Sequence, residues 1–323
     1  MVPILIIVIL LFSLLLIKSA DLVVVALRRI SRQTKTGVFA LSAFILAIGT
    51  SLPELFVAIT SSLEATPSLS LGNVLGANIA NISLVVGFSS LIAGKVIVHG
   101  SFLKRDVYIA LFAGLLPILL IIDGTLSRVD GLILLASYGA YATSLFRARF
   151  LEIAEEHKKE RFFYRFIRQF NHMDSARTKE LGRLFVGIAL LLISADVIVR
   201  VARQLAQEAN IPVFLVGLIV LSIGTTLPEI AFSFRSLKDH EPTMFFGNIL
   251  GSIIANSTLV IGVAALITPI KVVAVEAYIE AAIAFILVFF VFWNLIRSKF
   301  RLDRWESFIL LVLYIIFILV EFV

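Results

Sequence analysis

The sequence predicts an all-α integral membrane protein with ten transmembrane helices, arranged as two inverted five-helix repeats. Three observations point to this fold class. Of the 323 residues, 60% are hydrophobic and only 15% are charged, whereas soluble domains carry nearer a quarter charged residues. Apolar runs of more than about 18 residues recur along the chain, which favours helices over the shorter alternating strands of an outer-membrane barrel. A stretch of 39 residues also occurs twice.

The repeated stretch begins at Gly49 and again at Gly224, 175 residues later. The first copy reads GTSLPELFVAITSSLEATPSLSLGNVLGANIANISLVVG and the second GTTLPEIAFSFRSLKDHEPTMFFGNILGSIIANSTLVIG, with 17 of 39 positions identical and no gap. Each copy places one glutamate, Glu54 or Glu229, inside an apolar run. An ionisable group inside a membrane is costly and marks a functional site, so we expect one site built from two halves.

The apolar runs divide the chain into two sets of five helices. The first run has no basic leader and no small-residue cleavage signal, so we expect a retained helix. The predicted domains are residues 1–146 and 182–323, joined by a spacer at 147–181. The expected helices span about 3–27, 37–62, 69–93, 106–122 and 129–146, and then 182–203, 212–237, 244–267, 273–297 and 305–323.

Basic residues predict the orientation in the cell membrane. Most Lys and Arg near helix ends fall on alternate connections, and the other connections carry only Arg128, Arg200, Arg203 and Lys271. We therefore place the spacer in the cytoplasm and both termini outside. Because each half has an odd number of crossings, the second half enters the membrane upside down. Inverted repeats are typical of secondary transporters, whose site lies at the midplane.

The spacer interleaves aromatic and basic residues, which predicts a basic amphipathic helix on the anionic cytoplasmic leaflet. The net charge of +6 lies largely in such connections, so we expect a lipid bilayer as partner and no nucleic acid. Cysteine is absent, which excludes disulfides and thiolate metal sites. No motif indicates a cofactor, and a monomer would suffice for the site, although the sequence leaves the oligomeric state open.

Proline breaks each repeated helix beside its glutamate. Pro53 and Pro228 have no amide hydrogen, so the carbonyl groups of Gly49 and Gly224 lose their helical partners. Carboxylate, hydroxyl and carbonyl oxygens together suit a hard cation such as Ca²⁺. The predicted hydroxyl and amide ligands, which share a helix face with a glutamate or lie in the next helix, are Thr50, Ser51, Thr225, Thr226, Asn81 and Asn256.

Charge balance predicts competition between ions. Two carboxylates about 5 Å apart repel by roughly 3 kcal/mol at an effective dielectric constant of about 20, so an empty pair takes up protons or cations. One divalent ion, two monovalent ions or two protons would balance the pair, as an antiporter requires. A channel and an intramembrane hydrolase are the other classes to consider. The inverted repeat favours the antiporter over a channel, and the Ser, Thr and Asn residues resemble ion ligands more than a water-activating pair.

The motifs GTSLPE and GNVLGANIAN, repeated as GTTLPE and GNILGSIIAN, resemble the alpha repeats of the cation/Ca²⁺ exchanger superfamily, closest in form to prokaryotic sodium/calcium exchangers. The resemblance covers nearly the whole chain. It implies that Glu54 and Glu229 are the central ligands. It also implies a lining of side chains or carbonyls from Ala47, Thr50, Ser51, Asn81, Ser222, Thr225, Thr226, Ser252 and Asn256.

Three positions depart from the pattern of these exchangers. Ala77 stands where a serine is frequent, Asn256 where the second half often has aspartate, and Ile253 where the first half has Asn78. The resemblance therefore implies an antiporter that exchanges Ca²⁺ or a similar cation for Na⁺ by alternating access, with a proton-coupled H⁺/Ca²⁺ exchanger as the alternative. It implies no enzyme activity and no cofactor beyond the transported ions.

Overall fold

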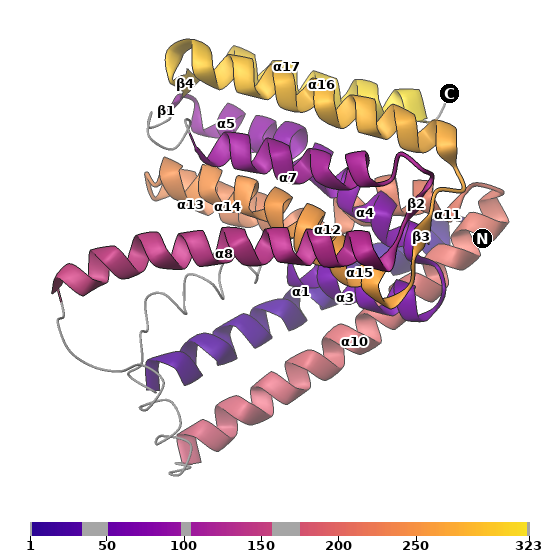
Figure 1. Cartoon of the computed structure of the whole chain (residues 1–323), viewed down its shortest axis with the longest axis horizontal. Coiled ribbons are helices and arrows are strands. Elements are labelled where there is room, and N and C mark those ends of the chain that lie inside the picture. Colours follow the sequence, from indigo (N-terminus) through magenta and orange to yellow (C-terminus); the bar gives the residue numbers. More distant parts are fainter. Residues whose placement is uncertain (1, 34–50, 98–104, 157–174, 322–323) are drawn as a thin grey trace.

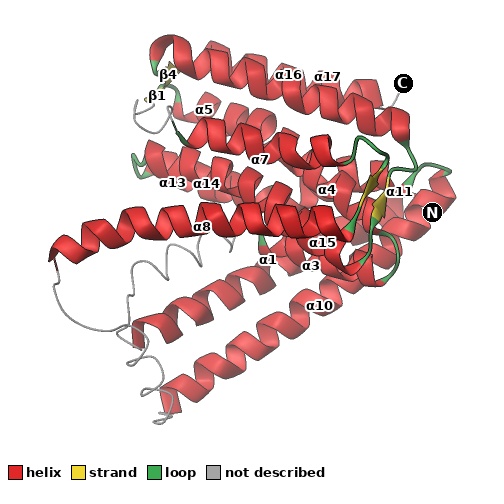
Figure 2. Ribbon diagram, viewed as in Figure 1, coloured by secondary structure: helices red, strands yellow, loops and turns green. Residues whose placement is uncertain are grey.

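The computed structural model describes residues 2–33, 51–97, 105–156 and 175–321. Most of these residues lie in long helices that run between two ends of the molecule, and the few strands lie in connections at those ends (Figures 1 and 2). Within the described part of the chain, six helical stretches are long and apolar enough to cross a membrane. They are Val2–Ala26, Pro67–Ala93, Glu180–Ala209, Val213–Lys238, Pro242–Ile267 and Val275–Lys299.

The helices of the first half follow the apolar runs of the sequence. A π-helical turn, η1, joins α4 to α5 without interruption, so this helix covers the predicted span 69–93. The elements are α1 (Val2–Gln33), α3 (Leu52–Leu63), α4 (Pro67–Ala80), η1 (Asn81–Val85), α5 (Val86–Ala93), α7 (Asp106–Leu120) and α8 (Arg128–Glu156).

The second half repeats this order. The elements are α10 (Ser175–Ala209), α11 (Val213–Leu215), η3 (Val216–Leu221), α12 (Ser222–Thr225), α13 (Leu227–Lys238), α14 (Pro242–Ile254), η4 (Ala255–Val260), α15 (Ile261–Ile267), α16 (Val275–Lys299) and α17 (Arg304–Glu321).

The two helices next to the spacer are longer than predicted. α8 continues ten residues past the predicted end at 146, and α10 begins seven residues before the predicted start at 182. Hydropathy marks where the apolar run ends, but a helix can continue into water when the following residues are good helix formers, as in the segment RARFLEIAEE. The predicted amphipathic segment within 157–174 and most of the predicted helix 37–62 lie outside the described residues.

Two pairs of short strands join the halves at opposite ends. β1 (Val96–Ile97) pairs antiparallel with β4 (Arg301–Leu302), and β2 (Thr125–Leu126) pairs antiparallel with β3 (Ile270–Lys271). Figure 1 shows the β1–β4 pair at one end, and the β2–β3 pair at the other end with both chain termini. Each pair thus joins one connection of the first half to one connection of the second.

The apolar core consists of two clusters. The larger one joins α4, α5, α7, α14, α15, α16 and α17. The smaller one lies mainly between α1 and α10, which run side by side along one flank of the molecule (Figure 1). It also includes Val57, Leu69, Val216 and Leu221, so α1 and α10 pack against the helices that carry the repeated motifs.

Candidate cation-binding site

Glu54 and Glu229 both lie in the first turn of a helix. α3 begins at Leu52 and α13 at Leu227, and in each the second residue is proline and the third is the glutamate. Glu54 is 1% exposed and Glu229 is fully buried. The first turn of a helix has N–H groups without helical acceptors and the positive end of the helix dipole, so it favours a carboxylate.

The break before α13 leaves a backbone carbonyl without its helical donor. Thr226 separates α12 from α13, and its ψ of −3° departs from the helical value. Pro228 has no N–H group, so the carbonyl of Gly224, four residues earlier, has no helical partner from that position. The corresponding carbonyl of the first half, that of Gly49, lies outside the described residues.

The two carboxyl groups act on each other electrostatically. A negative charge on Glu54 repels one on Glu229. Among the described residues, no hydrogen-bond partner meets any of the four carboxyl oxygens, although the Thr225 side chain lies beside Glu54. No Lys or Arg of the described chain forms an ion pair with either glutamate. Buried acids without a protein counter-charge must be neutralised by cations or protons.

Buried hydroxyl groups lie at the same two helix starts. Ser51 directly precedes α3, and its Oγ has no hydrogen-bond partner within the described ranges. Thr226 Oγ1 donates to the Ser222 carbonyl at 2.9 Å, and the Ser222 hydroxyl donates to a carbonyl one turn earlier. Thr225 Oγ1 donates to Asn73 Oδ1 at 3.2 Å. A hydroxyl that donates its hydrogen still offers lone pairs to a cation.

The two predicted asparagines lie in π-helical turns. Such turns frequently occur at functional sites. Asn81 is the first residue of η1 and Asn256 the second of η4, and both are fully buried. The amide oxygen of each has no hydrogen-bond partner in the part of the chain that is described. Amide oxygens are suitable ligands for a hard cation.

Three predicted ligands remain, and the structure describes only Ser252. Ser252 is fully buried on α14. Ala47 and Thr50 lie outside the described residues, so their part in the site stays a prediction.

Glycines bring the two halves into backbone contact at the site. A methyl group added to Gly76 would lie 2.0 Å from the Leu218 carbonyl oxygen, and one added to Gly217 would lie 2.3 Å from the Leu69 carbonyl oxygen. No residue larger than glycine fits at such distances without movement of the backbone. This crossing of α4 and η3 places Asn73 against Thr225 across the repeat boundary.

Sequence reasoning missed three polar residues that the fold brings to this region. Asn73 accepts the hydrogen bond from Thr225, and its recurrence at Asn248 was a signal that could have found it. Asn78 and Ser257 bond to each other across the halves. They carried no such signal, because the other copy of the repeat has isoleucine at both equivalent positions.

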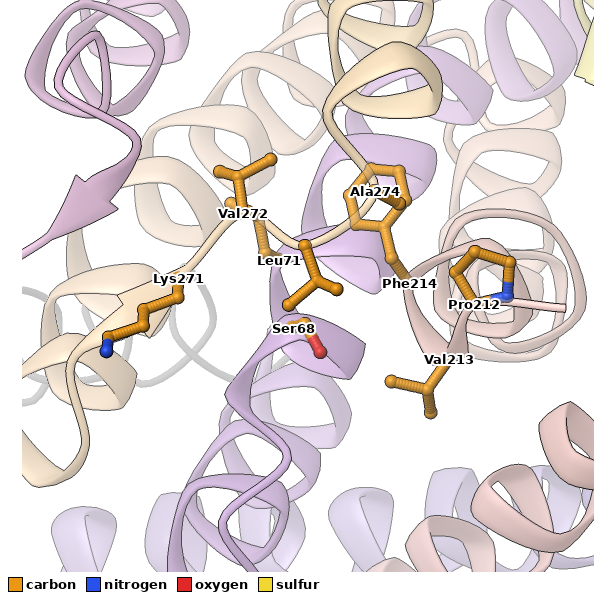
Figure 3. Close-up of a pocket in the computed structure, with 9 residues that line it drawn as sticks. Ser68, Leu71, Pro212, Val213, Phe214, Lys271, Val272 and Ala274 are labelled. Carbon is orange, nitrogen blue, oxygen red and sulfur yellow. The ribbon is translucent and has the colours of Figure 1, made fainter.

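A cavity of about 140 Å³ lies between α4, α11 and the β3–α16 connection, and neither glutamate lines it. Its lining includes Ser68, Leu71, Phe214 and Lys271. Figure 3 shows the Lys271 amine directed away from the other labelled side chains. No acidic side chain is among the described residues that line this cavity, so its chemistry does not suit a cation.

Comparison with known families gives a match over both halves of the chain. The sequence profile of the family described as "Sodium/calcium exchanger protein" matches residues 4–147 and 179–323. The chain belongs to this family of exchangers.

Curated proteins and solved structures that are similar to this chain support its assignment to the family. Sodium/calcium exchanger MaX1 of Methanosarcina acetivorans is 28% identical to this exchanger, with 95% of each chain covered. Inner membrane protein YrbG of Escherichia coli is 31% identical, with 79% of this chain and 78% of YrbG covered. Putative antiporter CaxA of Alkalimonas amylolytica is 30% identical over similar shares. The solved sodium-calcium exchanger NCX_Mj superposes with a TM-score of 0.61 at 27% identity and 99% coverage of both chains.

These similarities establish the class of the protein. It is a multi-pass membrane protein of the sodium/calcium exchanger family and takes part in cation exchange. Its relatives are named as exchangers and antiporters, so it is a transporter and not an enzyme.

Proposed function

We propose that the chain is a secondary active antiporter that exchanges Ca²⁺, or a similar cation, for Na⁺ by alternating access. One observation carries the proposal. Two buried glutamates at equivalent positions of α3 and α13 interact electrostatically. Within the described chain neither has an ion-pair partner, and only the Thr225 side chain lies beside Glu54. A single divalent ion balances the pair, and so do two monovalent ions, so the two kinds of ion compete for the same charges.

The donor set supports Ca²⁺ as one of the exchanged ions. Carboxylate, hydroxyl, amide and carbonyl oxygens are hard ligands, and Ca²⁺ accepts six to eight of them. Among the described residues, no three or more His, Cys, Asp or Glu side chains are grouped so that they could hold a metal ion, so the oxygens beyond the two carboxylates would come from hydroxyl, amide and carbonyl groups. The relatives MaX1 and NCX_Mj are named as sodium/calcium exchangers.

We place the site between two inverted repeats of five helices, residues 1–146 and 182–323, with 147–181 as a cytoplasmic spacer. The profile match in two segments that omit residues 148–178 supports this division. The strand pairs support the inversion. Residues 96 and 271, which are 175 apart, lie in β1 and β3, and these strands lie at opposite ends of the molecule. Among the described residues, Lys238 ends α13 at the β1–β4 end, and the basic residues of 299–304 lie in and beside β4. We therefore place that end in the cytoplasm and both termini outside.

Proton-coupled exchange is the second candidate. Asn256 stands where the family pattern often has an acid, so the pair of glutamates is the only source of negative charge among the described candidate ligands. Two protons would neutralise that pair as completely as one Ca²⁺ ion. The counter-ion therefore has to be identified by experiment.

The test is uptake of ⁴⁵Ca²⁺ into proteoliposomes loaded with Na⁺, with K⁺ or with acidic buffer. We expect Na⁺ loading to raise the rate at least tenfold over K⁺ loading. Glu54→Gln and Glu229→Gln should each abolish the stimulation, because a neutral amide cannot balance the ion. Glu276→Gln is the matched control, since Glu276 is an exposed glutamate in the first turn of α16. Stimulation by acid alone would make H⁺ the counter-ion, and equal uptake under all three conditions would contradict exchange.

A further inference from the structure

Three buried polar side chains form a hydrogen-bonded relay across the two halves. Asn256 Nδ2, on η4, donates to Asn78 Oδ1, on α4, at 3.4 Å. Asn78 Nδ2 in turn donates to Ser257 Oγ at 2.8 Å. All three residues are at most 2% exposed. Inside a protein such contacts hold side-chain orientation strongly, because unpaired polar groups are costly there.

In this chain of hydrogen bonds Asn256 donates through its NH₂ group and leaves its oxygen without a partner among the described residues. An asparagine side chain has a carbonyl oxygen that accepts and an NH₂ group that donates. The NH₂ group of Asn256 is directed to Asn78, and its Oδ1 has no hydrogen-bond partner among the described residues. If the amide were rotated by half a turn, it would turn its NH₂ group to where Oδ1 now lies, and that group would repel a cation.

Asn78 is itself hydrogen-bonded to Ser257. Because Asn78 Nδ2 is bonded to the Ser257 hydroxyl, Asn78 Oδ1 remains available to accept from Asn256. A serine hydroxyl can both donate and accept, so this chain of hydrogen bonds can run in either direction, and a cation at Asn256 Oδ1 favours the direction that the structure has.

We propose that Asn78 is a positioning residue of the cation site, which holds the Asn256 amide so that its oxygen is presented to the ion. This inference rests on the proposed function, since it assumes that Asn256 is a ligand. Asn78 itself acts through Asn256, because its own oxygen is occupied by the Asn256 amide.

The other copy of the repeat lacks the residues that would form the same hydrogen bonds. The equivalents of Asn78 and Ser257 in the other copy are Ile253 and Ile82, so Asn81 lacks such a relay. Neither amide atom of Asn81 has a partner in the described chain. The two asparagines at equivalent positions of the repeat thus differ, because Asn256 is hydrogen-bonded through its NH₂ group and Asn81 has no hydrogen-bond partner among the described residues.

The test compares Asn78→Ile in two backgrounds, by equilibrium binding of ⁴⁵Ca²⁺ to the purified protein in detergent. Isoleucine is the residue that the second repeat has at this position. With Asn256 present, we expect Asn78→Ile to weaken Ca²⁺ binding about tenfold. With Asn256→Asp, we expect the same substitution to weaken it less than threefold, because both oxygens of a carboxylate are equivalent and need no such orientation.

A merely structural role for Asn78 predicts the same loss in both backgrounds, and that result would overturn the proposal. Unchanged binding for Asn78→Ile beside Asn256 would overturn it as well. If Asn78→Ile does not fold, Ser257→Ala takes its place, with a smaller loss expected beside Asn256 and none beside Asp at that position. Failure of the proposed function is distinguishable, because the unsubstituted protein would then bind no Ca²⁺ or show no counter-ion-dependent uptake.

Discussion

Gly76 has no space for a side chain, because the Leu218 carbonyl of the other half lies against it. We expect Gly76→Ala to lower the free energy of unfolding by about 1–3 kcal/mol, the usual cost of forcing extra atoms into a packed region. Exchange should fall as well, since α4 carries Asn73 and Asn78 and would be pushed away from η3. The control is Gly139→Ala on α8, where an added methyl group would meet no atom within 4 Å. Equal melting temperatures for the two variants in detergent would contradict this close contact.

Sequence reasoning works best for residues that the two copies of the repeat share. It singled out both glutamates and both asparagines, and the structure describes all four as buried. It missed Asn78 and Ser257 because their contact joins positions at which the copies differ. A contact between α4 and η4 depends on how the halves pack, and a single sequence contains no measure of that packing.

At the scale of elements, an arginine of α10 interacts with a glutamate in the turn between α3 and α4. Arg203 Nη2 donates to the Glu64 carbonyl at 2.5 Å and lies 3.6 Å from the Glu64 carboxylate. We expect Arg203→Gln to lower the free energy of unfolding by about 1 kcal/mol, because a charge-assisted bond to a backbone carbonyl is lost. Thermal unfolding in detergent measures the change.

Arg200, one turn earlier on α10, provides the matched control. Its ion pair among the described residues is within the helix, with Asp196 at 3.0 Å, and both side chains are substantially exposed. An exposed pair of this kind contributes little to stability, so Arg200→Gln should change the melting temperature little. A larger loss for Arg200→Gln than for Arg203→Gln would contradict the assigned tie between α10 and the α3–α4 turn.

Hydropathy predicted the positions of helices that are apolar throughout, such as Pro67–Ala93 and Pro242–Ile267. The π-helical turns inside these helices could not be predicted, because a shift in backbone hydrogen bonding leaves no hydropathy signal. The two-residue strand pairs were missed for a related reason. Such short pairs depend on two connections that meet only after the bundle has formed.

At the scale of the whole molecule, the orientation can be tested directly because the chain has no cysteine. Lys238 at the end of α13 and Lys271 in β3 are exposed and lie at opposite ends of the molecule. We expect an impermeant thiol reagent outside intact cells to label Lys271→Cys and to leave Lys238→Cys unlabelled until the membrane is opened. The reverse pattern would contradict the proposed orientation, and labelling of both residues from outside would contradict their placement on opposite sides.

The central claim is that Glu54 and Glu229 bind one divalent ion together, and equilibrium binding of ⁴⁵Ca²⁺ to the purified protein tests it most directly. We predict one Ca²⁺ per chain for the unsubstituted protein. We predict that Glu54→Gln and Glu229→Gln each weaken binding by at least about a hundredfold, or roughly 2.7 kcal/mol, because either change removes half of the balancing charge. If either variant bound Ca²⁺ as tightly as the unsubstituted protein, the ion would not be shared and the claim would be wrong.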